Sequence, residues 1–311
     1  PNMWTNPREI PGNGIDDDNN GYVDDVYGYD FYYRDGDPMD GGGHGTHVAG
    51  TIGAAGNNVG GVAGVNWSVR IMALKFLSDD GWGFTADAIE AVEYAVRMGA
   101  HLSNNSWGGG GYSQALYDAI RAAGSADQLF VAAAGNEAND NDAWPSYPAS
   151  YDLENIIAVA ASDPADQLTW FSNYGRNSVD LAAPGDWILS CYPGSGYAYM
   201  DGTSMASPHV AGAAALILSL NPGLSAIQVK QLLLGSVDKV AAMRDLVRTG
   251  GRMNLSAALG QGGGLLAYFR ADDGGQTIED LTHQDDVLVG WRHAARFDGA
   301  AFDASLFAEM P

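Results

Sequence analysis

The chain of 311 residues has little cysteine and little positive charge. Its single cysteine, Cys191, excludes an internal disulfide framework and zinc sites built from cysteines. Only 15 lysines and arginines stand against 38 acidic residues, and a formal net charge of -23 argues against nucleic acid and anionic membranes as partners. No apolar run reaches the roughly 18 residues of a membrane span, because Pro208 and His209 interrupt the best candidate.

Charged residues are also scarce, at 17%, whereas hydrophobic residues make up 46% and glycines number 42. A chain of this length and composition can bury a core, which excludes wholesale disorder. The chain begins in a polar stretch without an initiator methionine or a signal peptide, and it ends abruptly. We therefore expect a fragment that is cut at both ends.

Short apolar runs alternate with helical patterns from residue 44 to about residue 259. Residues 85–98 place Ile89, Val92 and Val96 on one face at helical spacing. Further helices are expected over residues 203–220 and 225–234, and buried strands over residues 69–77, 101–106, 129–134, 156–161 and 179–183. Strands that alternate with helices predict an α/β fold with a mainly parallel sheet covered on both faces.

Two glycine-bounded segments put a candidate catalytic group at the start of a helix of small residues. Residues 43–51 read GHGTHVAGT, and residues 202–212 read GTSMASPHVAG. Ser204 would gain backbone N–H groups and the positive end of a helix dipole, which favour a developing oxyanion, but it needs a base to take its proton. Residues 132–137, AAAGNE, end a strand with Asn136, whose amide could donate to the same oxyanion.

Together these segments resemble the subtilisin-like serine proteases, the subtilases of peptidase family S8. The resemblance implies a three-layer α/β/α fold, with His44 as the general base, Ser204 as the nucleophile and Asn136 as the oxyanion-hole donor. His47 and His209 match family positions that are structural. Competing hydrolase motifs are missing, because Ser204 is not in a GxSxG elbow and the chain has no HExxH.

The family's triad also contains an aspartate, on a strand that ends in Asp-Thr-Gly or Asp-Ser-Gly well before the histidine. No such motif precedes His44, and the nine aspartates from Asp16 to Asp40 lie in turn-like sequence. We expect the catalytic aspartate to lie upstream of Pro1, on an inner strand of the parallel sheet. Because this aspartate holds the tautomer of the histidine, the fragment should be nearly inactive.

The resemblance also indicates two extended segments that would bind the substrate peptide as a β-ladder. Their residues are Gly81, Trp82, Gly83, Ser106, Trp107 and Gly108. Ala133, Ala134 and Gly135 would line the pocket for the residue before the scissile bond. These small residues predict an open pocket and a broad, apolar or aromatic preference, although the two tryptophans could also be ordinary surface aromatics.

Calcium is the expected cofactor, because several stretches combine the carboxylate, amide and carbonyl oxygens that hard cations prefer. By resemblance to calcium-binding subtilases, the first stretch would use the side chains of Asp30, Asp35 and Asp37 and the carbonyl of Met39. The second resembles the family's strong calcium loop and would use the Asn58 side chain and the carbonyls of Ala55, Gly60 and Val62.

A third acidic stretch looks like the front of an EF-hand loop. Asp16, Asp18, Asn20 and Asp24 have the spacing of its ligands, but Tyr27 stands where the glutamate at the twelfth position belongs. This stretch is equally compatible with a calcium site and with a solvated acidic turn.

The end of the chain changes character. We expect a catalytic domain over residues 1–259, a glycine-rich linker over residues 260–264, and a further module over residues 265–311. The last segment weakly resembles the opening strands of a LamG-type, concanavalin-A-like β-sandwich, a module that often binds carbohydrate or surface ligands. A linker with two incidental strands is the alternative.

Two functions from different classes follow. The first is a secreted or cell-surface, calcium-stabilised serine endopeptidase of broad specificity, acting on protein or peptide substrates through an acyl-enzyme and bound by its own propeptide. The second is a non-catalytic adhesion or binding protein on the same scaffold. The combination of His44, Asn136 and Ser204 favours the enzyme, because a pure scaffold needs none of them together.

Overall fold

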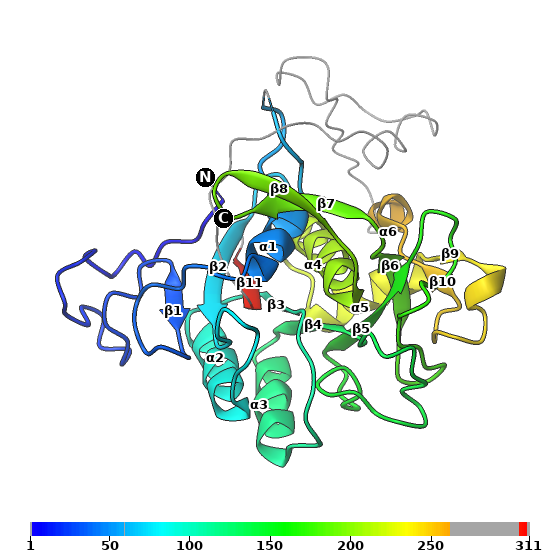
Figure 1. Cartoon of the computed structure of the whole chain (residues 1–311), viewed down its shortest axis with the longest axis horizontal. Coiled ribbons are helices and arrows are strands. Elements are labelled where there is room, and N and C mark those ends of the chain that lie inside the picture. The colour runs from blue at the N-terminus through cyan, green and yellow to red at the C-terminus, as the bar shows by residue number, and fades with distance from the viewer. Residues whose placement is uncertain (1, 59, 262–304, 310–311) are drawn as a thin grey trace.

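The computed structural model describes residues 2–58, 60–261 and 305–309 (Figure 1). The expected linker and C-terminal module therefore lie mostly outside the described residues. The helices are α1 (His44–Gly53), α2 (Thr85–Arg97), α3 (Gln114–Ser125), α4 (Thr203–Leu220), α5 (Ala226–Gly235) and α6 (Leu255–Gln261), with a short 3₁₀ helix, η1 (Ala241–Met243). Helix α6 takes in the first two residues of the expected linker.

The strands form one large sheet and one hairpin. They are β1 (Gly28–Asp30), β2 (Arg70–Lys75), β3 (Leu102–Asn105), β4 (Leu129–Ala133), β5 (Ile156–Ser162), β6 (Leu181–Pro184), β7 (Ile188–Tyr192), β8 (Gly196–Met200), β9 (Asp238–Lys239), β10 (Gly251–Arg252) and β11 (Ser305–Glu309). The nine-stranded sheet has the order β1-β2-β11-β3-β4-β5-β6-β10-β9, and β7 pairs with β8.

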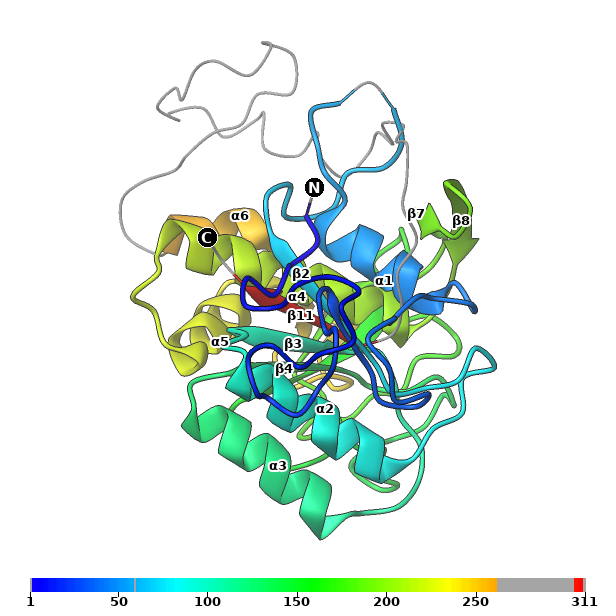
Figure 2. The same cartoon turned by 90° about the vertical axis from the view of Figure 1, so that its left-hand side faces the viewer.

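The sheet is mainly parallel and lies between two layers of helices, as predicted. Strands β3 to β6 pair in parallel in sequence order, and so do β1 and β2. Helices α2 and α3 cover one face, while α1 and α4 cover the other, with α5 and α6 beside α4 (Figures 1 and 2). Both faces of the central strands are therefore buried, which explains why every residue of β4 and all but the last residue of β5 are apolar.

One strand departs from the expected plan. Residues 305–309, which we expected in a separate module, form β11 inside the main sheet. Strand β11 is antiparallel to both β2 and β3, which are therefore parallel to each other. Inner strands need a hydrogen-bonding partner on each side, and β11 supplies one to both neighbours.

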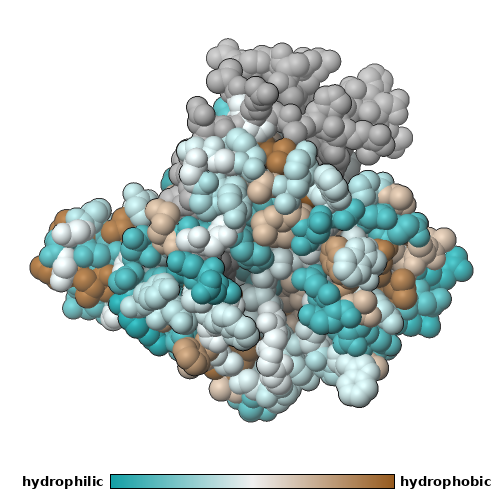
Figure 3. Space-filling model, in the orientation of Figure 1, coloured by the Kyte–Doolittle hydropathy of each residue, from teal (hydrophilic) through white to brown (hydrophobic). Residues whose placement is uncertain are grey.

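Helix α4 is the central helix of the core. By length and composition it is apolar enough to cross a membrane, which differs from our reading of the sequence, but 72% of its eighteen-residue window is buried in the fold. Its alanines and Val210 pack against the sheet and against α1. The outer surface is mostly hydrophilic on the face that Figure 3 shows, with scattered apolar patches.

The buried ring of His209 predicts how stability depends on pH. Burial lowers the pKa of His209 to about 4, although its hydrogen bond to the Met205 carbonyl (2.8 Å) opposes this shift. The unfolded chain takes up this proton near pH 6.5, whereas the folded chain takes it up only near pH 4. The free energy of unfolding should therefore fall by roughly 3 kcal/mol as the pH falls from about 6.5 to about 4.

Denaturant unfolding at a series of pH values measures this dependence. His209→Gln should flatten the slope in this window, whereas the same change at the exposed His101 should leave it unaltered. A ring pKa of 6 or above for His209 by NMR titration would contradict the assignment.

Candidate active site

Helices α1 and α4 each present a candidate catalytic residue in the first turn. His44 is the first residue of α1 and Ser204 the second of α4, and the two helices pack directly against each other. The contact is close because of a glycine. A Cβ atom at Gly212 would lie 3.0 Å from the carbonyl oxygen of Ile52 on α1 and 2.8 Å from Cβ of Val65. The small residues of both segments therefore set the distance between the helices.

The start of α1 is fixed by the carboxylate of Asp40. Its Oδ1 accepts hydrogen bonds from the N–H groups of Gly42 (2.9 Å) and Gly43 (2.6 Å), and its Oδ2 accepts from the N–H (2.8 Å) and hydroxyl (2.6 Å) of Thr46. Gly43 has a φ of 89°, a conformation that favours glycine. Asp40 thus satisfies backbone donors that the helix itself leaves free.

Ser204 is held by contacts with the end of β3. Pro208 has no N–H, so the carbonyl of Ser204 lacks its usual partner four residues later. The hydroxyl of Ser106 donates to this carbonyl instead (2.8 Å) and also contacts the hydroxyl of Ser207 (2.8 Å). The hydroxyl of Ser204 donates to the carbonyl of Ser106 (3.3 Å), and its side chain is half-buried. Ser106, expected among the substrate contacts, therefore positions Ser204, the expected nucleophile.

Asn136 is oriented by Thr203, a residue that the sequence reasoning did not single out. The Oδ1 atom of Asn136 accepts hydrogen bonds from the N–H (2.9 Å) and the hydroxyl (3.0 Å) of Thr203. The same hydroxyl accepts from the N–H of Gly135 (3.1 Å). Because Oδ1 already accepts both hydrogen bonds from Thr203, the Nδ2 group of Asn136 remains as a donor beside the start of α4.

The ring of His44 has the electrostatics of a neutral base. Burial lowers its pKa below the usual value, and the negative charge of Asp40 raises it only in part. Both oxygens of Asp40 are committed to the start of α1, and within residues 2–58, 60–261 and 305–309 the His44 ring forms no hydrogen bond. Among the described residues, the expected base therefore has no carboxylate that orients its ring.

The two expected substrate segments differ in exposure. Leu77 pairs with Gly83 across a tight turn, which leaves the Trp82 side chain 78% exposed. Trp107 is half-buried, because its ring packs edge-on against that of Phe76, with 5.0 Å between the ring centroids. Gly81 lies in the same turn as Trp82, and Gly108 is exposed beside Trp107.

The expected pocket wall lies at the end of β4. Ala133 and Ala134 are buried, and Gly135 has a φ of 114° where the chain turns toward Asn136. Their role in binding the substrate remains a prediction.

The first expected calcium stretch forms a compact turn. Asp30 is buried, and its Oδ1 accepts from the N–H groups of Tyr32 and Tyr33 (2.8 Å each). The carboxylate of Asp35 accepts from the N–H of Asp37 (3.0 Å). Burial raises the pKa of Asp30, which a bound cation would offset. Met39 follows with its side chain 49% exposed.

The second stretch forms a loop in which the amide of Asn58 donates to the carbonyl of Ala55 (3.1 Å). Gly60 and Val62 continue the loop, and Val62 is buried against Ala54. The side chain of Asn58 and the carbonyl of Ala55, two of the expected ligands, thus lie side by side.

In the third stretch, Asp16 and Asp18 lie together but Asp24 does not join them. Its two carboxylate oxygens accept from the N–H groups of Gly12 (2.7 Å), Asn13 (3.1 Å) and Gly14 (2.9 Å), so Asp24 shapes a turn. A residue outside the pattern, Glu9, lies beside Asp16 and Asp18. No spacing rule pointed to Glu9, because it precedes the acidic run.

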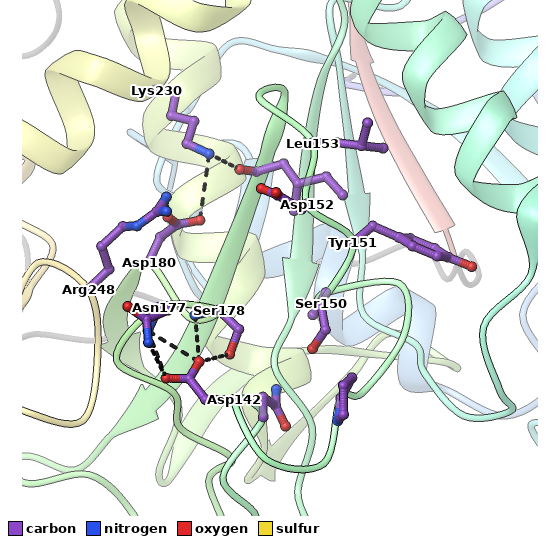
Figure 4. A pocket seen from close by; sticks show the side chains of 14 residues that line it. Asp142, Ser150, Tyr151, Asp152, Leu153, Asn177, Ser178, Asp180, Lys230 and Arg248 are labelled. Atoms are coloured by element: carbon purple, nitrogen blue, oxygen red, sulfur yellow. Dashed lines mark hydrogen bonds and ion pairs between the residues drawn. The ribbon is translucent and has the colours of Figure 1, made fainter.

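A separate cavity of about 390 Å³ lies between the start of β5 and the middle of α5 (Figure 4). The amino group of Lys230 donates to the carbonyl of Ile156 and lies 3.7 Å from the Oδ2 atom of Asp180. The Oδ1 atom of Asp180 also pairs with the guanidinium of Arg248 (3.3 Å). Burial lowers the pKa of Lys230. Both basic side chains of the cavity thus pair with Asp180, and the cavity is lined by none of the candidate catalytic residues.

The sequence is similar to a known protein family and to several of its members. The family model described as "Subtilase family" (Peptidase_S8) matches residues 5–262. The thermophilic serine proteinase of Bacillus sp. (strain AK1) is 44% identical over 216 residues, which are 70% of this chain and 52% of that protein. Thermitase of Thermoactinomyces vulgaris is 42% identical over 216 residues, 70% of this chain and 75% of its own length.

Two further similarities cover more of this chain. Subtilisin-like protease 1 of Plasmodium vivax is 36% identical over 83% of this chain and 44% of its own length. The crystal structure of a cold adapted subtilisin-like serine proteinase superposes with a TM-score of 0.61 at 33% identity, covering 81% of this chain and 84% of that one. The chain thus spans about half the length of the Bacillus and Plasmodium vivax relatives. On the family match and the shared fold, it belongs to the subtilase family.

Proposed function

We propose that the protein is a secreted or cell-surface serine endopeptidase that cleaves peptide bonds through an acyl-enzyme on Ser204. The observation that carries this proposal is the arrangement of His44 and Ser204 on two packed helices, with Asn136 locked by Thr203. A pure binding scaffold would not need Asn136 oriented in this way.

The chemistry follows from these positions. Neutral His44 takes the proton of the Ser204 hydroxyl as its oxygen attacks the peptide carbonyl carbon. The negative charge that develops on the carbonyl oxygen is stabilised by the Asn136 Nδ2 group and by the N–H of Ser204 in the first turn of α4. His44 then gives its proton to the leaving amine, and a water molecule hydrolyses the acyl-enzyme by the same route.

The proposed machinery also needs a carboxylate behind His44, and none in the described part of the chain hydrogen-bonds to this ring. We place it on a strand upstream of Pro1, in an inner position of the sheet. The position that β11 holds between β2 and β3 suits such a strand, because its two neighbours are parallel to each other. In subtilisin, loss of this aspartate lowers kcat by about 3 × 10⁴. The 311-residue chain should therefore be a very slow catalyst.

Substrate binding in this proposal uses backbone pairing and an open pocket. The segments Gly81–Gly83 and Ser106–Gly108 would pair with an extended peptide, which recognises peptides in general. The small residues Ala133 to Gly135 would admit a large apolar or aromatic side chain. Broad specificity follows, since neither feature selects one sequence.

Labelling with a fluorophosphonate tests the proposed nucleophile. The 311-residue chain should be modified slowly and at Ser204 alone, as mass spectrometry of the digested adduct would show. His44→Ala should slow the reaction further, and a chain that contains the upstream strand should react about 10⁴-fold faster. A fast burst of acylation by the 311-residue chain would contradict the missing-carboxylate proposal, and no labelling of Ser204 in the longer chain would contradict the enzyme itself.

Thr203→Val tests whether Thr203 orients the oxyanion donor. This isosteric change keeps the N–H bond to Asn136 but removes the hydroxyl that links Asn136 and Gly135. We expect the rate of Ser204 acylation to fall about tenfold, which is less than the loss of the amide itself would cause. Thr203→Ser, which keeps the hydroxyl, should retain the rate. An unchanged rate in Thr203→Val would show that Asn136 is oriented by other means.

Calcium should stabilise the protein through the turn around Asp30. At a free concentration 100-fold above Kd, one site adds about 2.7 kcal/mol to the free energy of unfolding. Calorimetric melting with calcium and with chelator should therefore give a higher midpoint with calcium, and Asp37→Asn should reduce the gain. Asp118→Asn, which removes an exposed acid on α3, is the matched control. The same midpoint in both buffers would rule out calcium stabilisation.

A further inference from the structure

A buried lysine ends an inner strand close to one of the expected substrate segments. Lys75 is the last residue of β2, and its side chain is only 2% exposed. A buried ammonium group is costly unless polar or charged partners surround it. The Nζ atom donates to the carbonyl of Leu77 (2.7 Å) and to Oδ1 of Asp79 (2.9 Å), and it lies 5.5 Å from the centroid of the Tyr33 ring.

Both of these acceptors lie at the base of the turn that carries the expected substrate segment, residues 81–83. The turn closes where Leu77 forms an antiparallel bridge with Gly83. At its tip, a Cβ atom at Gly81 would meet no described atom within 4 Å, so the tip projects from the rest of the fold. The position of the tip therefore depends on the base of the turn, which Lys75 holds from the strand.

The same turn lies against the residues that lead into α1. A Cβ atom at Gly41 would overlap the carboxylate of Asp79, and one at Gly42 would lie 2.7 Å from the carbonyl oxygen of Asp79. Because both positions are glycine, Asp79 fits directly against this segment, which ends just before His44. The Lys75 ammonium thus holds Asp79 on one side, and the two glycines accommodate it on the other.

We propose that Lys75 is a positioning residue that holds the turn of residues 77–83 where an extended substrate peptide pairs with it. The inference rests on the proposed protease function, because the turn has this role only if a peptide binds along it. Pairing with an extended peptide is favourable when the backbone that receives it is already ordered. The pair of Lys75 and Asp79 should therefore favour ligands that reach the turn, and it should not affect a small ligand at Ser204.

The partial exposure of this ion pair fits a positioning role better than a stabilising one. The Asp79 side chain is 51% exposed, and an ion pair that is open to solvent adds little to stability. Replacing a buried charge by an apolar side chain of similar size is often neutral for stability. Lys75→Met therefore removes the link to the turn but keeps the unbranched stem that fills the core.

Two phosphonate probes that both modify Ser204 separate positioning from chemistry. A small fluorophosphonate reaches the nucleophile alone, whereas a peptidyl phosphonate that extends over several residues on its acyl side also reaches residues 81–83. In the 311-residue chain, Lys75→Met and Asp79→Ala should each lower the second-order rate of labelling by the peptidyl probe about tenfold. The rate with the small probe should stay the same.

Asp80→Ala is the matched control for the loss of charge. Asp80 is exposed in the same turn, and within the described part of the chain its side chain forms no hydrogen bond or ion pair. Both probes should label this variant at the rates of the unchanged chain. Because Asp79 is partly exposed, Asp79→Ala tests the inference even if Lys75→Met folds poorly.

The comparison of the two probes decides between the possible roles of Lys75. A loss with the peptidyl probe alone supports positioning of the turn. An equal loss with both probes would show a general structural role, and unchanged rates would show no role, so either result would overturn the inference while the proposed function stands. If neither probe labelled Ser204 in the unchanged chain, the proposed function would fail and the inference with it.

Discussion

The close approach of α1 and α4 is the constraint on which the candidate active site depends. Gly212 lets the backbone of α4 come against Ile52 of α1, and a Cβ atom there would force the helices apart. His44 and Ser204 both lie in first turns, so any shift between the helices moves the proposed base relative to the proposed nucleophile. The small side chains of the two segments thus serve packing first, and the chemistry follows from the packing.

Most of the fold could be predicted from the sequence because the strands are buried on both faces. Continuous apolar runs such as residues 129–134 and 156–161 can lie only in the centre of such a sheet, and the strands β4 and β5 agree with them to within a residue. Residues 305–309 could not be placed in this way. Their position inside the sheet depends on the pairing needs of β2 and β3, which are distant in the sequence.

The sequence indicated candidate residues at the start of a helix or the end of a strand, but not the residues that hold them in place. The motifs pointed to His44, Ser204 and Asn136, but the hydroxyl that orients Asn136 belongs to Thr203, whose contacts only the fold reveals. Glu9 is a similar case, because its carboxylate reaches the acidic loop through the path of the chain. Asp24 matched the loop pattern but is used by the turn of residues 12–14.

The central claim is that Ser204 and Asn136 form a preorganised site for an oxyanion. A crystal structure of a longer chain that includes the upstream strand, with a phosphonate bound covalently to Ser204, tests it most directly. We predict a phosphonyl oxygen about 2.7–3.1 Å from both the Nδ2 atom of Asn136 and the backbone nitrogen of Ser204. An adduct whose oxygen turns away from Asn136 would contradict the account.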